Sequence, residues 1–130
     1  MIKFFLVVLF ALFPMGFMQS ADDVASEVGK ALEKGNSRGL ARYFGPNVEL
    51  YLPGTEGTFS RSQSEVILRD FFSRNQPAGF TISRQWAARD GSIYVIGTLK
   101  TREGTNYRAY YLIKRVSQTF LLHQLHLEPQ

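Results

Sequence analysis

The pattern of apolar and polar positions predicts helices at the start of the chain. Apolar side chains recur at spacings of three and four over residues 22–34, which is typical of an amphipathic helix. A second, shorter helix is predicted over residues 37–44. A third is predicted over residues 62–75, where Ser62 and Glu65 have the spacing of a capping box.

The rest of the chain shows the alternation that is typical of strands. A first strand is predicted over residues 48–52, and residues 53–60 are interpreted as a loop. Four further strands are predicted, at residues 80–88, 92–101, 105–116 and 119–128. Helices followed by antiparallel strands indicate an α+β domain, in which three N-terminal helices pack on a curved, mainly antiparallel sheet.

Length and composition fit one globular domain. The chain has 130 residues, of which 45% are hydrophobic. Its formal charge is +4, but the basic residues are scattered, so we expect no nucleic-acid partner. It contains no cysteine, so the core alone must stabilise the fold.

The first 20 residues have the order of a secretory signal peptide. Lys3 precedes an apolar run over residues 4–13, and small residues follow at Ser20 and Ala21. The run is shorter than the roughly 20 residues of a spanning helix. We therefore predict a signal peptide over residues 1–20 and a single domain over residues 21–130, exported to a periplasm or secreted, with no membrane attachment after cleavage. A retained signal anchor is the alternative.

The order of elements resembles the nuclear transport factor two-like fold, the cone shared with ketosteroid isomerases and polyketide cyclases. The resemblance covers nearly all of residues 22–128. It is carried by the stretches ALEKGNSRGLARYFGPNVELYLPG, SQSEVILRDFF, IGTLKTREGTNYRAYYLIKR and FLLHQLHLE. The chain also resembles a family of small exported proteins from Bacteroidota that is catalogued as a domain of unknown function. The resemblance implies a fold but no activity, because this fold hosts enzymes and many non-catalytic modules.

The two histidines, His123 and His126, lie three residues apart on the last predicted strand. Alternation places them on opposite faces of the sheet. A shared metal ion is therefore not expected, and no cofactor is expected. His123 shares the inward face with leucines, and His126 points outward.

His123 is the candidate for a pocket between the helices and the sheet. The candidate lining residues are His123, Tyr107, Tyr111 and Trp86, around a small apolar ligand. The alternative is a core histidine that is hydrogen-bonded to a neighbour. No catalytic residue is assigned, because isomerase-like chemistry needs an acid in the pocket and Glu49 alternates away from the core.

The outward face of the sheet is too apolar for contact with water alone. Its candidate residues are Tyr94, Ile96, Tyr110, Leu112, Phe120 and Leu122. A homodimer packed sheet against sheet accounts for this pattern, and the fold resemblance also implies one. The alternative is a set of scattered exposed apolar residues.

These observations lead to one functional expectation and two alternatives. We expect an exported, non-catalytic module that binds a small ligand or a protein partner in the cell envelope. The first alternative is a small-molecule isomerase or cyclase that uses His123 in a pocket. The second is a structural homodimer with a filled core.

Overall fold

The computed structural model describes residues 19–130, so the predicted signal peptide lies outside the described residues except for its last two positions. The elements are α1 (Ala21–Lys34), α2 (Ser37–Ala41), β1 (Phe44–Leu52), β2 (Thr55–Ser60), α3 (Arg61–Arg74), β3 (Pro77–Ala87), β4 (Ile93–Thr101), β5 (Asn106–Val116) and β6 (Thr119–Pro129). No helix among these residues is long and apolar enough to cross a membrane.

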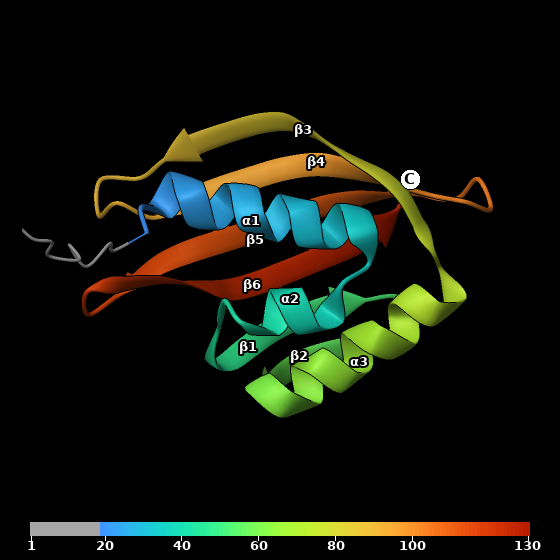
Figure 1. The fold of residues 1–130 in the computed structure, drawn as a ribbon, viewed down its shortest axis with the longest axis horizontal. Coiled ribbons are helices and arrows are strands. Elements are labelled where there is room, and N and C mark those ends of the chain that lie inside the picture. The colour runs from blue at the N-terminus through green and yellow to red at the C-terminus, as the bar shows by residue number, and fades with distance from the viewer. Residues whose placement is uncertain (1–18) are drawn as a thin grey trace, which may run out of the picture.

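The six strands form one curved sheet in the order β2-β1-β6-β5-β4-β3. All neighbours are antiparallel except β1 and β6, which are parallel. The three helices lie on one side of the sheet (Figure 1). The predicted α+β fold is confirmed. The interpretation of residues 53–60 as a loop is wrong, because residues 55–60 form β2 and extend the sheet by one strand.

The helix boundaries are set by side-chain caps. Ser20 accepts a hydrogen bond from the backbone N–H of Asp23, whose side chain in turn accepts from Ser20, and this capping box begins α1. Gly35 ends α1 in the left-handed conformation at φ 63°. The capping box of α3 lies two residues before the predicted one, at Ser60 and Gln63, because β2 runs directly into the helix.

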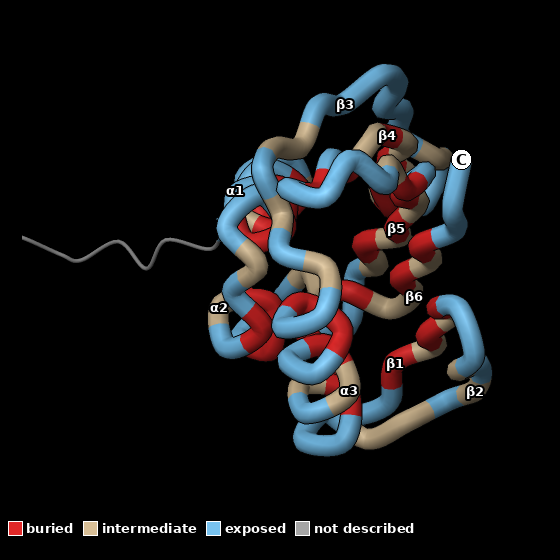
Figure 2. Tube along the Cα trace, turned by 90° about the vertical axis from the view of Figure 1, so that its right-hand side faces the viewer, coloured by how far each residue is buried: buried red, intermediate tan, exposed pale blue. Residues whose placement is uncertain are grey.

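The core lies between the helices and the inner face of the sheet. Buried residues alternate with half-buried ones along β4, β5, β6 and β1 (Figure 2). Tyr111 is fully buried, and its hydroxyl donates a hydrogen bond of 2.8 Å to the carbonyl oxygen of Ala25 in α1. The Tyr107 hydroxyl donates to the side chain of Asn75 at 2.8 Å. Both tyrosines therefore tie helical segments to the sheet.

A β-bulge in β6 changes which residues face the core. Leu112 of β5 pairs with Gln124, but the next residue, Ile113, pairs with Leu122, so His123 is an extra residue between them. Leu122 and Leu125 are both fully buried, although three positions separate them. The prediction that His123 points inward is therefore wrong, and the prediction that Leu122 points outward is wrong for the same reason.

Candidate functional site

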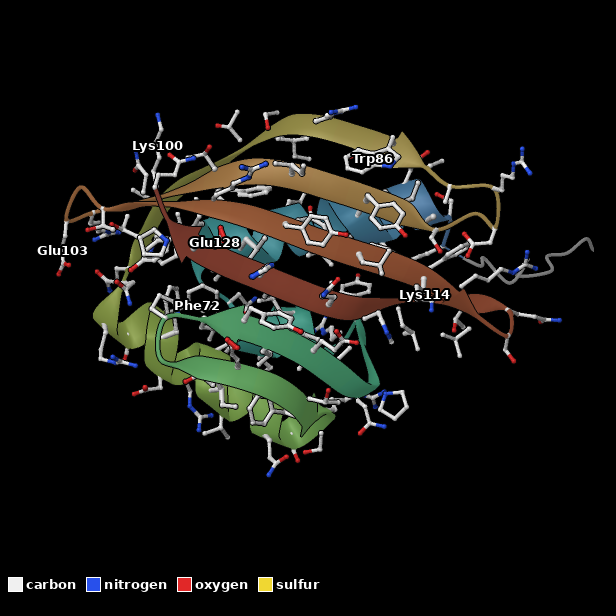
Figure 3. All side chains as sticks on the ribbon, turned by 180° about the vertical axis from the view of Figure 1, so that it is seen from behind. Phe72, Trp86, Lys100, Glu103, Lys114 and Glu128 are labelled. Carbon is white, nitrogen blue, oxygen red and sulfur yellow. The ribbon has the colours of Figure 1, made fainter. Side chains whose placement is uncertain are left out.

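The outer face of the sheet, opposite the helices, carries a row of rings that crosses five strands. Its members are Trp86 of β3, Tyr94 of β4, Tyr110 of β5, His126 of β6 and Tyr51 of β1. Successive ring centroids are 5.3, 6.2, 6.4 and 4.5 Å apart. We call this set the aromatic row. Figure 3 shows Trp86 and this face from behind, with the helices on the far side of the sheet.

The row begins at its most exposed member. Trp86 is 38% exposed and stacks on Tyr94 at an interplanar angle of 11°. The Arg84 guanidinium lies 5.0 Å from the Trp86 ring centroid, within the range of a cation–π interaction. Tryptophan, tyrosine and arginine are the residues that dominate binding energy at protein interfaces.

The other end of the row is hollowed around His126. One shallow cavity of about 180 Å³ is lined by Arg108, Tyr110, His126 and Glu128. A second of about 170 Å³ lies between His126 and the β1–β2 turn, and Tyr51 and Glu56 are among its lining residues. His126 Nε2 lies 3.8 Å from a Glu128 carboxylate oxygen. The face is therefore sculpted as well as apolar.

His123 lies at a separate hollow where β1 and β6 part. This His123 hollow has a volume of about 230 Å³, and its lining residues are Gly45, Pro46, Asn47, Val116, Leu121, Leu122 and His123. His123 Nε2 is 3.7 Å from a carboxylate oxygen of Glu49, and the Gln124 amide donates to the other oxygen at 3.4 Å. Both the histidine and the glutamate remain about 40% exposed (41% and 38%).

The four residues expected to line one pocket are not brought together. Tyr107 and Tyr111 lie in the core, where their hydroxyls are engaged by Asn75 and α1. Trp86 and His123 lie on the opposite side of the sheet, on β3 and β6, and two strands, β4 and β5, separate them. The expectation of a pocket shared by these four is therefore wrong.

Most of the residues expected on the outward face do lie there. Tyr94, Ile96, Tyr110 and Leu112 are half-buried and alternate with buried neighbours of β4 and β5. Leu122 is fully buried, and Phe120 packs partly against the core, so these two do not belong to the outer face. The bulge at His123 is the cause, since it reverses the alternation of β6 on its N-terminal side.

Charged side chains divide the outer face into two halves. Basic residues lie on β3, β4 and β5, at Arg84, Lys100, Arg108 and Lys114. Acidic residues lie on β6, β1 and β2, at Glu128, Glu49 and Glu56. We call these the basic half and the acidic half. Alternation within its strand already placed Glu49 away from the core, but Arg84 follows an irregularity in β3 and Glu56 lies in the stretch interpreted as a loop, so the sequence did not assign these two to a face.

The arrangement suits binding better than acid–base catalysis. The two histidine–glutamate separations, 3.7 and 3.8 Å, exceed hydrogen-bond length, and the groups are open to solvent, which screens their interaction. Among residues 19–130, no group of three or more histidine, aspartate and glutamate side chains could hold a metal ion. A sculpted face of rings edged with charge is instead typical of an interface.

Comparisons with known proteins agree with this fold. A family model described as "Domain of unknown function (DUF4783)" matches residues 25–128. A solved DUF4783 structure from Bacteroides ovatus is 31% identical with a TM-score of 0.74, over 81% of this chain and 94% of that one. One from Bacteroides fragilis is 33% identical with a TM-score of 0.72, over 80% and 96%. An NTF2-like protein of unknown function from Cytophaga hutchinsonii, 12% identical over 89% and 95%, has a TM-score of 0.63 and shows the fold alone. No curated protein matches.

Proposed function

The chain belongs to the DUF4783 family, and from this premise we propose that it is an exported, non-catalytic binding module that dimerises through the outer face of its sheet. The aromatic row carries the proposal. Its five rings cross five strands in continuous contact on the side of the sheet away from the helices. A soluble monomer rarely exposes so continuous an apolar patch without a partner for it.

The size of the face supports a protein partner. Six strands at spacings of about 4.8 Å span roughly 24 Å, and the 11 residues of β5 span roughly 36 Å. The product, roughly 860 Å², is close to the roughly 800 Å² that each partner buries in an interface of standard size. A second copy is a partner that is always present at the same concentration as the first.

A substitution at the centre of the face tests the dimer. Tyr110 lies on β5, in the middle of the strand order, and forms ring contacts with both of its neighbours in the row. We expect the wild-type protein to sediment as a dimer at tens of micromolar. Tyr110→Lys should weaken the dimer by about 2 kcal/mol, roughly thirtyfold in dissociation constant, because it buries a charge at the centre of an apolar contact.

The control places the same side chain on the other side of the molecule. Val66 is 51% exposed on α3, so Val66→Lys should leave the sedimentation unchanged. Thermal melts of both variants check that each is folded. A wild-type protein that sediments as a monomer at tens of micromolar would contradict the proposal.

The export part of the proposal rests on the signal-like first 20 residues. Cleavage is expected just before or within the first turn of α1, which begins at Ala21 with Ser20 as its cap. Mass spectrometry of the protein recovered from the envelope or the medium should give a mature start at Ala21 or Asp22. A recovered protein that still begins at Met1 would show that the segment is not removed.

A further inference from the structure

We propose that the dimer has a two-fold axis that runs along the strands between β5 and β6, so that Arg84 of each copy faces the partner's Glu56. This inference rests on the proposed dimer and specifies its geometry. In the same arrangement, Tyr94 of each copy lies over the partner's Glu49, beside the partner's His123 hollow.

The strand order places the axis. In the order β2-β1-β6-β5-β4-β3, three strands lie on each side of the boundary between β6 and β5. A two-fold axis along this boundary places β3 over β2, β4 over β1 and β5 over β6 of the second copy. Each strand of the face then has a partner, and the interface is isologous, with the same patch used by both copies.

The register of the strands decides which residues face one another. Arg84 pairs with Ile96, which pairs with Tyr110. We call such a row of residues that pair across neighbouring strands a level. The same level continues across the boundary onto β6, β1 and β2, because Tyr110 pairs with His126, His126 with Tyr51, and Tyr51 with Glu56. Arg84 and Glu56 are therefore the two ends of one level across the whole sheet. A rotation about the central axis brings each over the other end of the second copy.

The charges favour this axis over the alternative. An axis along the strands places the basic half of one copy on the acidic half of the other. A two-fold axis across the strands would place the basic half on itself, and like charges in contact cost several kcal/mol. Within residues 19–130, neither Arg84 nor Glu56 forms an ion pair in its own chain. Arg108 and Glu128, which pair in register on β5 and β6, face each other a second time across the axis.

The shape of the face agrees with the same axis. Trp86, Tyr94, Leu112, Gln124 and Glu49 form the next level of paired residues. The rotation places Tyr94 over the partner's Glu49, and Glu49 lies 3.7 Å from His123, which lines the His123 hollow. The hollow, about 230 Å³, exceeds the roughly 150 Å³ of a cavity that holds benzene, so it has room for part of an aromatic side chain.

Charge reversal at the two edges tests the axis. Arg84→Glu and Glu56→Arg should each raise the dimer dissociation constant about tenfold, since each places like charges together twice per dimer. The double variant, Arg84→Glu with Glu56→Arg, should return it to within about threefold of wild type. Within one chain the two residues lie five strand spacings apart, roughly 24 Å, so such a rescue must act between copies.

Cross-linking gives a second measurement that does not depend on affinity. Packed sheets lie about 10 Å apart, which is too far for a disulfide but suits a short bismaleimide. The chain has no cysteine, so introduced ones are the sole targets. A mixture of Arg84→Cys and Glu56→Cys proteins should cross-link, and neither should do so alone.

The outcomes separate this geometry from the dimer itself. If wild type is dimeric but the double variant is as weak as the single ones, or if Arg84→Cys cross-links to itself, the axis proposed here is overturned while the outer-face dimer stands. If Tyr110→Lys also leaves the dimer unchanged, the copies associate through another surface and both proposals fail. A monomeric wild-type protein overturns both as well.

Discussion

Gly97→Ala should destabilise the protein by about 3 kcal/mol, near the upper end of the usual cost of overpacking. Gly97 lies in the middle of β4, between β3 and β5, at a position whose side chain would point into the core. A β-carbon at this position would lie 2.5 Å from the carbonyl oxygen of Thr81 and 2.8 Å from the Phe80 ring. The carbonyl is part of the neighbouring strand, so relief of the contact requires β3 and β4 to shift.

The lack of a side chain at Gly97 allows α1 to pack closely on the sheet. The Phe80 ring fills the space above Gly97 and also approaches Gly29 of α1, where a β-carbon would lie 3.4 Å from it. It also packs against Tyr111, at a centroid distance of 6.2 Å. Two glycines, one in the sheet and one in the helix, thus make room for one phenylalanine between them.

The matched control is Gly79→Ala in β3, where an added β-carbon meets no atom within 4 Å. This substitution should be neutral or stabilising by about 0.5 kcal/mol, because alanine restricts the unfolded chain. Urea unfolding of both variants measures the difference. Equal free energies of unfolding for the two variants would show that β3 yields at Gly97 without cost.

The elements that follow strong local patterns were predictable from the sequence. The helical spacing of residues 22–34 and the alternation along β4 and β5 are uninterrupted, so their buried faces were assigned correctly. Residues 55–60 escaped prediction because Gly57 and two threonines give little alternation, and their pairing with β1 supplies the missing constraint. The parallel contact of β1 with β6 joins segments about 75 residues apart, which no local pattern reports.

The candidate site was only partly predictable, for a similar reason. Tyr94 and Tyr110 could be placed on the outer face by alternation within their own strands. His123 could not, because one extra residue in β6 reverses the side chains that precede it and leaves no mark in the composition. The aromatic row and the opposed charges of Arg84 and Glu56 arise only from register across several strands.

Tyr111→Ala should have the largest effect on stability, about 4 kcal/mol, because it removes a fully buried aromatic side chain and leaves a cavity. Among residues 19–130, Tyr111 is the largest of the fully buried side chains, and its ring and hydroxyl lie between β5 and α1. Tyr111→Phe, which keeps the ring and removes only the hydrogen bond to Ala25, should cost about 1 kcal/mol. Chemical denaturation of the three proteins gives both differences.

The stabilities of wild type and Tyr111→Phe should also depend differently on pH. Burial raises the pKa of Tyr111 well above its ordinary value of 10.0, so the folded protein keeps this proton at a pH where the unfolded chain loses it. Stability that the neutral phenol contributes is therefore complete below about pH 10 and falls as pH rises above it. Tyr111→Phe should lose less stability at alkaline pH than wild type does. The loss that remains comes from Tyr110, whose pKa is also raised, first by burial and then by Tyr94. Parallel alkaline stability curves for the two proteins would mean that the Tyr111 hydroxyl reaches solvent, and would contradict its place in the core.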